Sequence, residues 1–82
     1  MGEWLVVHWC DIVGVEDPWI TGAEAEALQP ARMITAGWLV KDTEEFLVIA
    51  STLEDAEDPQ LGNVNCIPKG VISKIESARG GL

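Results

Sequence analysis

The sequence predicts a mainly β protein in which five short strands form a small antiparallel barrel, with one short helix between the first two strands. Two observations indicate this class. Runs rich in β-branched and aromatic residues alternate with turn residues along the chain. Only residues 21–28 have the composition and the capping residues of a helix. Because 82 residues form one core, we expect a single barrel domain at 1–77 and a flexible C-terminal tail at 78–82.

The first strand is expected at residues 3–10, EWLVVHWC. Apolar side chains occupy both its odd-numbered and its even-numbered positions, which point to opposite faces of a strand, so both faces are expected to be buried. Gly14 and Pro18 indicate a loop after this strand. Thr21 and Glu24 then have the spacing of a capping box, so the short helix is expected to begin there.

Four more strands complete the expected sheet. Gly37, inside the second strand, predicts a bulge or a sharp bend of the kind that curls small barrels. The acidic loop at 53–62 lacks the spacing of a calcium site and is expected to be solvated. The four strands are expected at residues 31–42, 46–52, 63–67 and 71–76, with a hairpin turn at 42–45.

The formal net charge is −9, from 14 acidic and 5 basic residues, and the basic residues form no cluster. Nucleic acids and anionic membrane surfaces are bound through a positive face, so this charge argues against DNA, RNA and membrane partners. No apolar run approaches the roughly 20 residues of a membrane span, and no leader-like segment is present. We therefore expect a cytoplasmic protein.

A domain of this size has a small core and needs a further source of stability. Cys10 and Cys66 are expected to be reduced and to serve as small apolar core residues, without forming a disulfide. The sequence has no cluster of cysteine and histidine, so no metal or other cofactor is expected. Association into a homo-oligomer is the expected stabiliser.

Catalysis is not expected. His8 is the only histidine, and Cys10 lies two positions further, on the same face of the first strand. A Cys–His pair can act as nucleophile and base. This face is expected to point inward, however, where a thiol is inert. The sequence also lacks the nucleophile-elbow, zinc-protease and phosphate-loop motifs.

The segment CIPKGVI, residues 66–72, resembles the element between the last two strands of Src-homology-three-like small barrels, and the order of elements also resembles Sm-like barrels. In the former family this pattern forms a 3₁₀ turn, so the resemblance implies such a turn before the last strand. Pro68 fixes φ of the turn and Gly70 can adopt a positive φ. Lys69 is expected to point outward.

Four short elements lie between Trp9 and Ile75: Trp9-Cys10-Asp11, Trp19, Thr35-Ala36-Gly37-Trp38-Leu39 and Ile67-Pro68-Lys69. Through them, this part of the chain resembles small proteins encoded by tailed phages and prophages. Some small phage proteins act against host immunity by sequestering nucleotide second messengers. The resemblance thus implies a non-catalytic sponge for such a nucleotide, acting in the host cytoplasm.

Six side chains are candidates for a ligand-binding site. A tryptophan can stack on a base, asparagine amides can bind a base edge, and a basic side chain can bind a phosphate. The alternative is that the tryptophans form core or subunit contacts and that the polar side chains are simply solvated. The candidates are Trp19, Trp38, Arg32, Asn63, Asn65 and Lys69.

A second class of function is a protein-interaction module, which would use tryptophans and acidic loops to hold a host or phage protein or a Pro-rich peptide, as Src-homology-three-like domains do. The acidic balance of the chain favours this class if the partner is basic. The phage resemblance favours the nucleotide. Both hypotheses predict a binding protein without catalytic activity.

Overall fold

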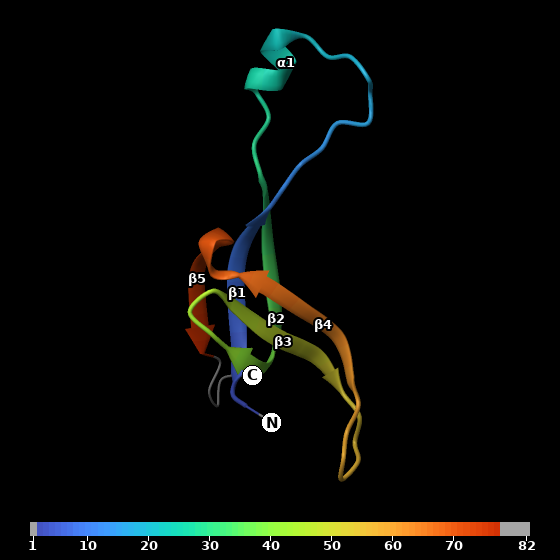
Figure 1. The fold of residues 1–82 in the computed structure, drawn as a ribbon, viewed down its shortest axis with the longest axis vertical. Helices are drawn as coiled ribbons and strands as arrows, with labels where there is room; N and C mark the ends of the chain where they lie inside the picture. The colour runs from blue at the N-terminus through green and yellow to red at the C-terminus, as the bar shows by residue number, and fades with distance from the viewer. Residues whose placement is uncertain (1, 78–82) are drawn as a thin grey trace.

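Five runs of β-branched and aromatic residues form the strands of one antiparallel sheet in the computed structural model, which describes residues 2–77 (Figure 1). The strand order is β4-β3-β2-β1-β5. The expected tail at 78–82 lies outside the described residues. The strands are β1 (Trp4–Asp11), β2 (Ala31–Asp42), β3 (Phe46–Leu53), β4 (Leu61–Pro68) and β5 (Ile72–Ser77), and the helices are α1 (Gly22–Glu26) and the 3₁₀ turn η1 (Lys69–Val71).

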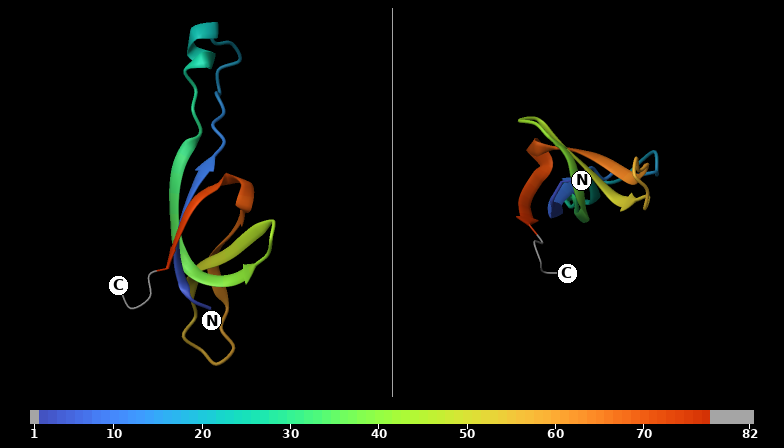
Figure 2. Two further views of the ribbon diagram at one scale, coloured as in Figure 1. Left: turned by 90° about the vertical axis from the view of Figure 1, so that its left-hand side faces the viewer. Right: turned by 90° about the horizontal axis from the view of Figure 1, so that it is seen from below.

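This architecture confirms a mainly β protein with five antiparallel strands and a 3₁₀ turn before the last strand. The expected helix is reduced to the five residues of α1, little more than one turn. Over the described residues the sheet is not closed into a barrel by strand pairing, because β4 and β5 are its two edges. The sheet is nevertheless strongly coiled, and β3 and β4 run obliquely to β1 and β2 (Figure 2). No helix in residues 2–77 has the length and apolar composition needed to cross a membrane.

The coiling of the sheet has an identifiable source in β2. The first part of this long strand pairs with β1 and the last part pairs with β3. A register shift between Leu39 and Lys41 separates the β2–β3 pairs, so the irregularity expected at Gly37 lies a few residues later. Gly37 has a different role: a Cβ there would lie 2.8 Å from the carbonyl carbon of Ala50. A glycine lets the two backbones approach this closely.

The core lies on one face of the sheet. Alternating residues of β1 and β3 point into it, as the period of two in a strand requires. The prediction that the first strand is buried on both faces is therefore wrong, because its other alternating set is only partly buried. The core residues are Leu5, Val7, Leu47, Ile49 and Ile67, and Trp9, Leu39 and Ile72 pack against them.

The segment between β1 and β2 projects away from the sheet and carries α1 near its tip (Figure 1). We call residues 12–30 the arm. The molecule is 54 Å long in its longest dimension, against 26 and 22 Å in the others, with the arm at one end and the hairpin of β3 and β4 at the other (Figure 1). α1 is held by its own cap, which confirms the predicted capping box: the Glu24 backbone N–H donates to Thr21 Oγ1 over 3.1 Å. α1 has no buried residue, so packing does not hold it in place.

Candidate functional site

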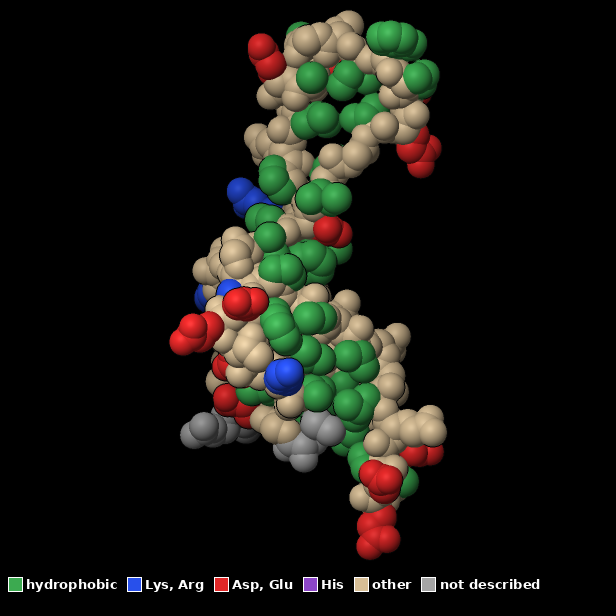
Figure 3. All heavy atoms as spheres, in the orientation of Figure 1, with side chains coloured by type: hydrophobic (Ala, Val, Ile, Leu, Met, Phe, Trp, Pro, Cys, Tyr) green, Lys and Arg blue, Asp and Glu red, His purple; other side chains and the backbone are tan. Residues whose placement is uncertain are grey.

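The arm exposes large apolar side chains, none of which is among the residues that form the core or the partly buried ones packed against it. Every residue from Asp11 to Pro30 is exposed. The side chain of Ile12 is 92% exposed and that of Trp19 is 88% exposed. Figure 3 shows further hydrophobic side chains on the arm, with acidic side chains at its margins. A projecting element with this much exposed apolar surface is typical of an interaction site.

The charge of the arm is entirely acidic. Residues 12–30 include Glu16, Asp17, Glu24 and Glu26 and no basic residue. These carboxylates are solvated and flank the apolar side chains, so a surface that covers the arm must be apolar and also tolerate or neutralise negative charge.

The sheet has a second face, opposite the core, that is also apolar. Residues that face each other across an antiparallel pair lie on the same side of a sheet, and so do alternate residues of one strand. The register of β1 with β2 and β5 therefore defines this face. We call it the second face; it comprises Trp4, Val6, His8 and Cys10 of β1, Arg32, Ile34, Ala36 and Trp38 of β2, and Lys74 and Glu76 of β5.

Aromatic packing occupies one end of the second face. The rings of Trp4 and Trp38 form an edge-to-face pair with their centroids 4.8 Å apart. The Nε1 of Trp4 is buried and has no hydrogen-bond partner among the described residues. Further along the same face, the side chain of Ile34 is 68% exposed. The second face therefore leaves apolar surface uncovered in the single chain.

Charged side chains occupy the other part of this face. His8 Nε2 lies 2.6 Å from Glu76 Oε1, and Lys74 Nζ lies 3.8 Å from the same oxygen. The hydrogen bond with His8, followed by the charge of Lys74, holds the pKa of the Glu76 carboxyl below its ordinary value of 4.5. Arg32 has no ion-pair partner among residues 2–77.

The lowered pKa of Glu76 predicts a pH-dependent loss of stability. Ionised Glu76 stabilises the fold above its ordinary pKa of 4.5, and this contribution is lost as the pH falls through the lowered folded-state value. Urea unfolding at neutral and acidic pH should therefore show a steeper loss on acidification for the wild type than for Glu76→Gln. Because the pair is exposed, we expect the difference to be small. Equal losses in both proteins would contradict this assignment.

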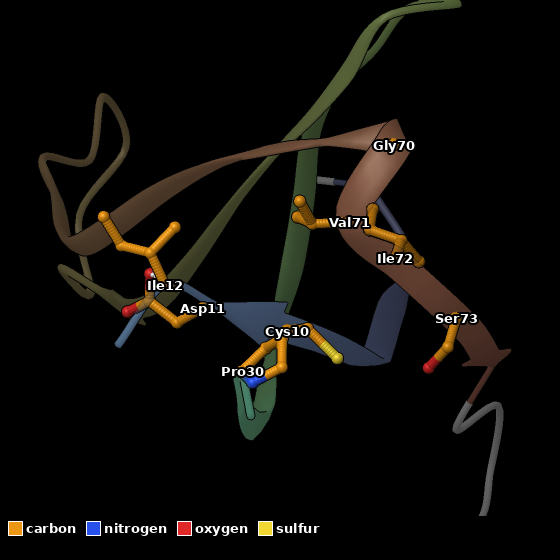
Figure 4. A pocket seen from close by; sticks show the side chains of 8 residues that line it. All are labelled: Cys10, Asp11, Ile12, Pro30, Gly70, Val71, Ile72 and Ser73. Atoms are coloured by element: carbon orange, nitrogen blue, oxygen red, sulfur yellow. Dashed lines mark hydrogen bonds between the residues drawn. The ribbon is translucent and has the colours of Figure 1, made fainter. Parts of the chain in front are cut away.

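Two cavities lie where the arm leaves the sheet, and Cys10 and Ser73 line both. Figure 4 shows the first, with Cys10, Asp11 and Ile12 on one side and the segment from Val71 to Ser73 on the other. Its volume is about 390 Å³. The second has a volume of about 520 Å³ and is lined by His8, Trp9, Cys10, Arg32, Met33, Ile34 and Ser73.

The two cysteines do not lie where the sequence predicted. Cys10 is half-buried at the cavities and Cys66 is exposed, so the expectation that both are core residues is wrong. The reason is that successive side chains of a strand point to opposite faces of the sheet. In β1 and β4, Val7 and Ile67 point into the core, so Cys10 and Cys66 point to the opposite face. The expectation that His8 and Cys10 point inward fails for the same reason.

The six candidate residues lie in separate regions. Trp19 is in the arm, and Arg32 lines the larger cavity at the start of β2. Trp38 packs against Trp4. On β4, Asn63 Nδ2 donates to Thr52 Oγ1 over 3.0 Å and Asn65 Nδ2 donates to the carbonyl oxygen of Asn63 over 3.4 Å. Within one chain, the structure therefore brings together only Asn63 and Asn65 among the six candidates.

Lys69 has a partner that the sequence analysis did not identify. Its Nζ lies 2.8 Å from Asp42 Oδ1, and its backbone N–H donates to the carbonyl oxygen of Glu45 over 2.7 Å. The side chain is one third exposed, so it does not point freely outward as expected. An anion at Lys69 would have to compete with the Asp42 carboxylate.

The Lys69–Asp42 ion pair predicts a small structural effect. Because both side chains are partly exposed, Lys69→Ala should lower the free energy of unfolding by no more than about 1 kcal/mol. Urea unfolding measures this, and the double variant with Asp42→Asn should lose little more than the single variant. A loss several times larger would show that the turn depends on this pair.

The comparisons with known proteins add no identification. No protein-family model, no curated protein and no solved structure matches this chain. Within residues 2–77, no group of three or more His, Cys, Asp or Glu side chains is placed to hold a metal ion. The candidate site is therefore defined by this chain's own geometry: the arm, the second face and the cavities between them.

Proposed function

We propose that this protein is a non-catalytic interaction module that binds another protein through its arm. One observation carries the proposal: every residue of the arm is exposed, although it includes Trp19 and Ile12, which are 88% and 92% exposed. Tryptophan is among the residues that contribute most to protein interfaces when a partner buries it. The capping box pre-forms the tip of the arm, which lowers the entropy lost on binding.

The acidity of the arm narrows the class of partner. Its four carboxylates would be repelled by an acidic surface and attracted by a basic one. An apolar patch flanked by lysine or arginine side chains has the chemistry that fits the arm. Host and phage proteins with such a patch are the proposed partners.

Paired baits test this function. Wild-type protein and Trp19→Ser are immobilised at equal density and exposed to the same bacterial lysate, and the captured proteins are quantified. Because Trp19 contacts nothing in the core, both baits should have the same melting temperature. At least one protein should be captured by the wild type and lost from Trp19→Ser. Identical capture by the two baits would contradict the proposal.

A second candidate function is binding of a nucleotide, for which the phage-type resemblance suggests an anti-defence sponge. The larger cavity supports it, because its volume of about 520 Å³ lies within the range of small-molecule sites. Arg32 and Trp9, which line it, could bind a phosphate and a ring. A thermal-shift screen with cyclic and linear nucleotides tests this: stabilisation that is lost in Arg32→Ala supports it, and no stabilisation excludes it.

We also propose that the coiled sheet closes into a small barrel. A Src-homology-three-like or Sm-like barrel is supported by the coiling of the sheet and by η1, which joins the two edge strands through three residues. Interstrand contacts between β4 and β5 in solution NMR spectra would establish closure. Their absence would leave an open sheet.

A further inference from the structure

We propose that the arm of one molecule docks on the second face of another copy of this chain, and that two copies exchange their arms reciprocally. The inference rests on the proposed function, in which the arm binds a protein surface, and identifies this chain itself as one such surface. It follows from the apolar character, the charge and the placement of the two elements.

The apolar parts of the two elements match. The arm offers Ile12 and Trp19, which are almost fully exposed. The second face offers Ile34, 68% exposed, beside the cavity of about 520 Å³ that His8 and Arg32 also line. A hollow of this size can accept an aromatic side chain, which is the usual arrangement at the centre of an interface.

The charges of the two elements are opposite. The arm contributes four carboxylates and no basic residue. On the second face, Lys74 is paired with the one carboxylate, that of Glu76, which His8 also contacts, and Arg32 has no ion-pair partner among residues 2–77. The positive charge available to the arm is therefore that of Arg32. The charged residues of this face thus sum to +1 in a chain of net charge −9, which favours contact with an acidic arm.

The arm cannot reach the second face of its own chain in this conformation. The pairing of β1 with β2 continues to its last pair, Asp11 with Ala31, at the base of the arm. The arm therefore continues in the direction of these strands, away from the sheet (Figure 1). A second copy can meet it, and a two-fold axis would make both contacts at once. Two such contacts can reach the roughly 800 Å² per partner of a stable interface.

A charge-exchange experiment tests this arrangement. The arm variant carries Glu16→Lys and Asp17→Lys, and the face variant carries Arg32→Glu and Lys74→Glu. Sedimentation measures the mass of each, where a single chain is 8.9 kDa. We expect the wild type to dimerise and each variant alone to dimerise at least about tenfold more weakly. The arm variant loses the net negative charge of the arm, because two lysines then balance Glu24 and Glu26. In the face variant, an acidic arm meets an acidic face. An equimolar mixture should recover the dimer. One contact of the mixed pair is that of the wild type, and the other places the two introduced lysines against the two introduced glutamates.

Trp19→Ser is the uncharged control, and it should weaken the dimer without changing the fold, as circular dichroism would show. If either charge variant fails to fold, this control alone decides the question. A wild type that stays monomeric overturns arm exchange but leaves the proposed function, because the arm is then free for another protein. Dimers unaffected by the variants, or a mixture that does not recover, also overturn it. The proposed function itself fails only if the two baits capture the same proteins.

Discussion

Ile49→Ala is expected to unfold most of the protein. Ile49 is fully buried in a core of only a few side chains, where truncating isoleucine to alanine costs about 2–5 kcal/mol. A domain of this size has on the order of 3–5 kcal/mol to lose. Urea unfolding followed by circular dichroism should therefore show a wild-type transition and little or none in the variant.

The matched control is Ile12→Ala, the same substitution in the arm. Its side chain is 92% exposed, so the free energy of unfolding should change by less than about 0.5 kcal/mol. The measurement is made at a concentration low enough to keep the chain monomeric. Equal destabilisation by the two variants would show that the arm packs on the core, and would remove the basis for treating it as a docking element.

Gly37→Ala has the second-largest expected effect. The added Cβ would lie 2.8 Å from the carbonyl carbon of Ala50, and neither backbone can move without disturbing the pairing of β2 with β3. Overpacking of this kind costs about 1–3 kcal/mol. Thermal unfolding measures the loss.

Gly14→Ala is the control for this prediction. A Cβ at Gly14 in the arm would have no neighbour within 4 Å. The variant should therefore be as stable as the wild type, or more stable by up to about 1 kcal/mol through a smaller unfolded-state entropy. If Gly37→Ala were as stable as Gly14→Ala, the backbones of β2 and β3 could not lie as close together at Gly37 as described.

Local chemistry made most of the secondary structure predictable. The strand at Ala31–Asp42 has the expected bounds, and the other strands begin and end within two residues of theirs. The capping box was also predictable, because Thr21 and Glu24 are close in sequence. Which side chains of β1 point into the core could not be predicted. Both its odd-numbered and its even-numbered positions are apolar, and only pairing with distant strands decides which of them are buried.

The candidate site was less predictable because it depends on distant parts of the chain. The exposure of Trp19 follows from its place after Pro18 in a loop. The pairing of Lys69 with Asp42 joins residues far apart in sequence, and nothing in the local pattern indicates it. The length of the arm and its direction depend on how far β1 and β2 pair, which alternation alone does not determine.

Fluorine NMR of protein labelled with fluorotryptophan tests most directly that the arm contacts another protein surface. The four tryptophans give separate signals, and Trp→Phe variants assign them. In a dilute solution of the protein, the Trp19 signal should show the largest solvent isotope shift, because this residue is 88% exposed. We expect this shift to be lost as the protein concentration rises or when a captured partner is added, while the signal of Trp4 changes least. A Trp19 signal that keeps its solvent isotope shift under all these conditions would show that the arm does not contact another protein surface.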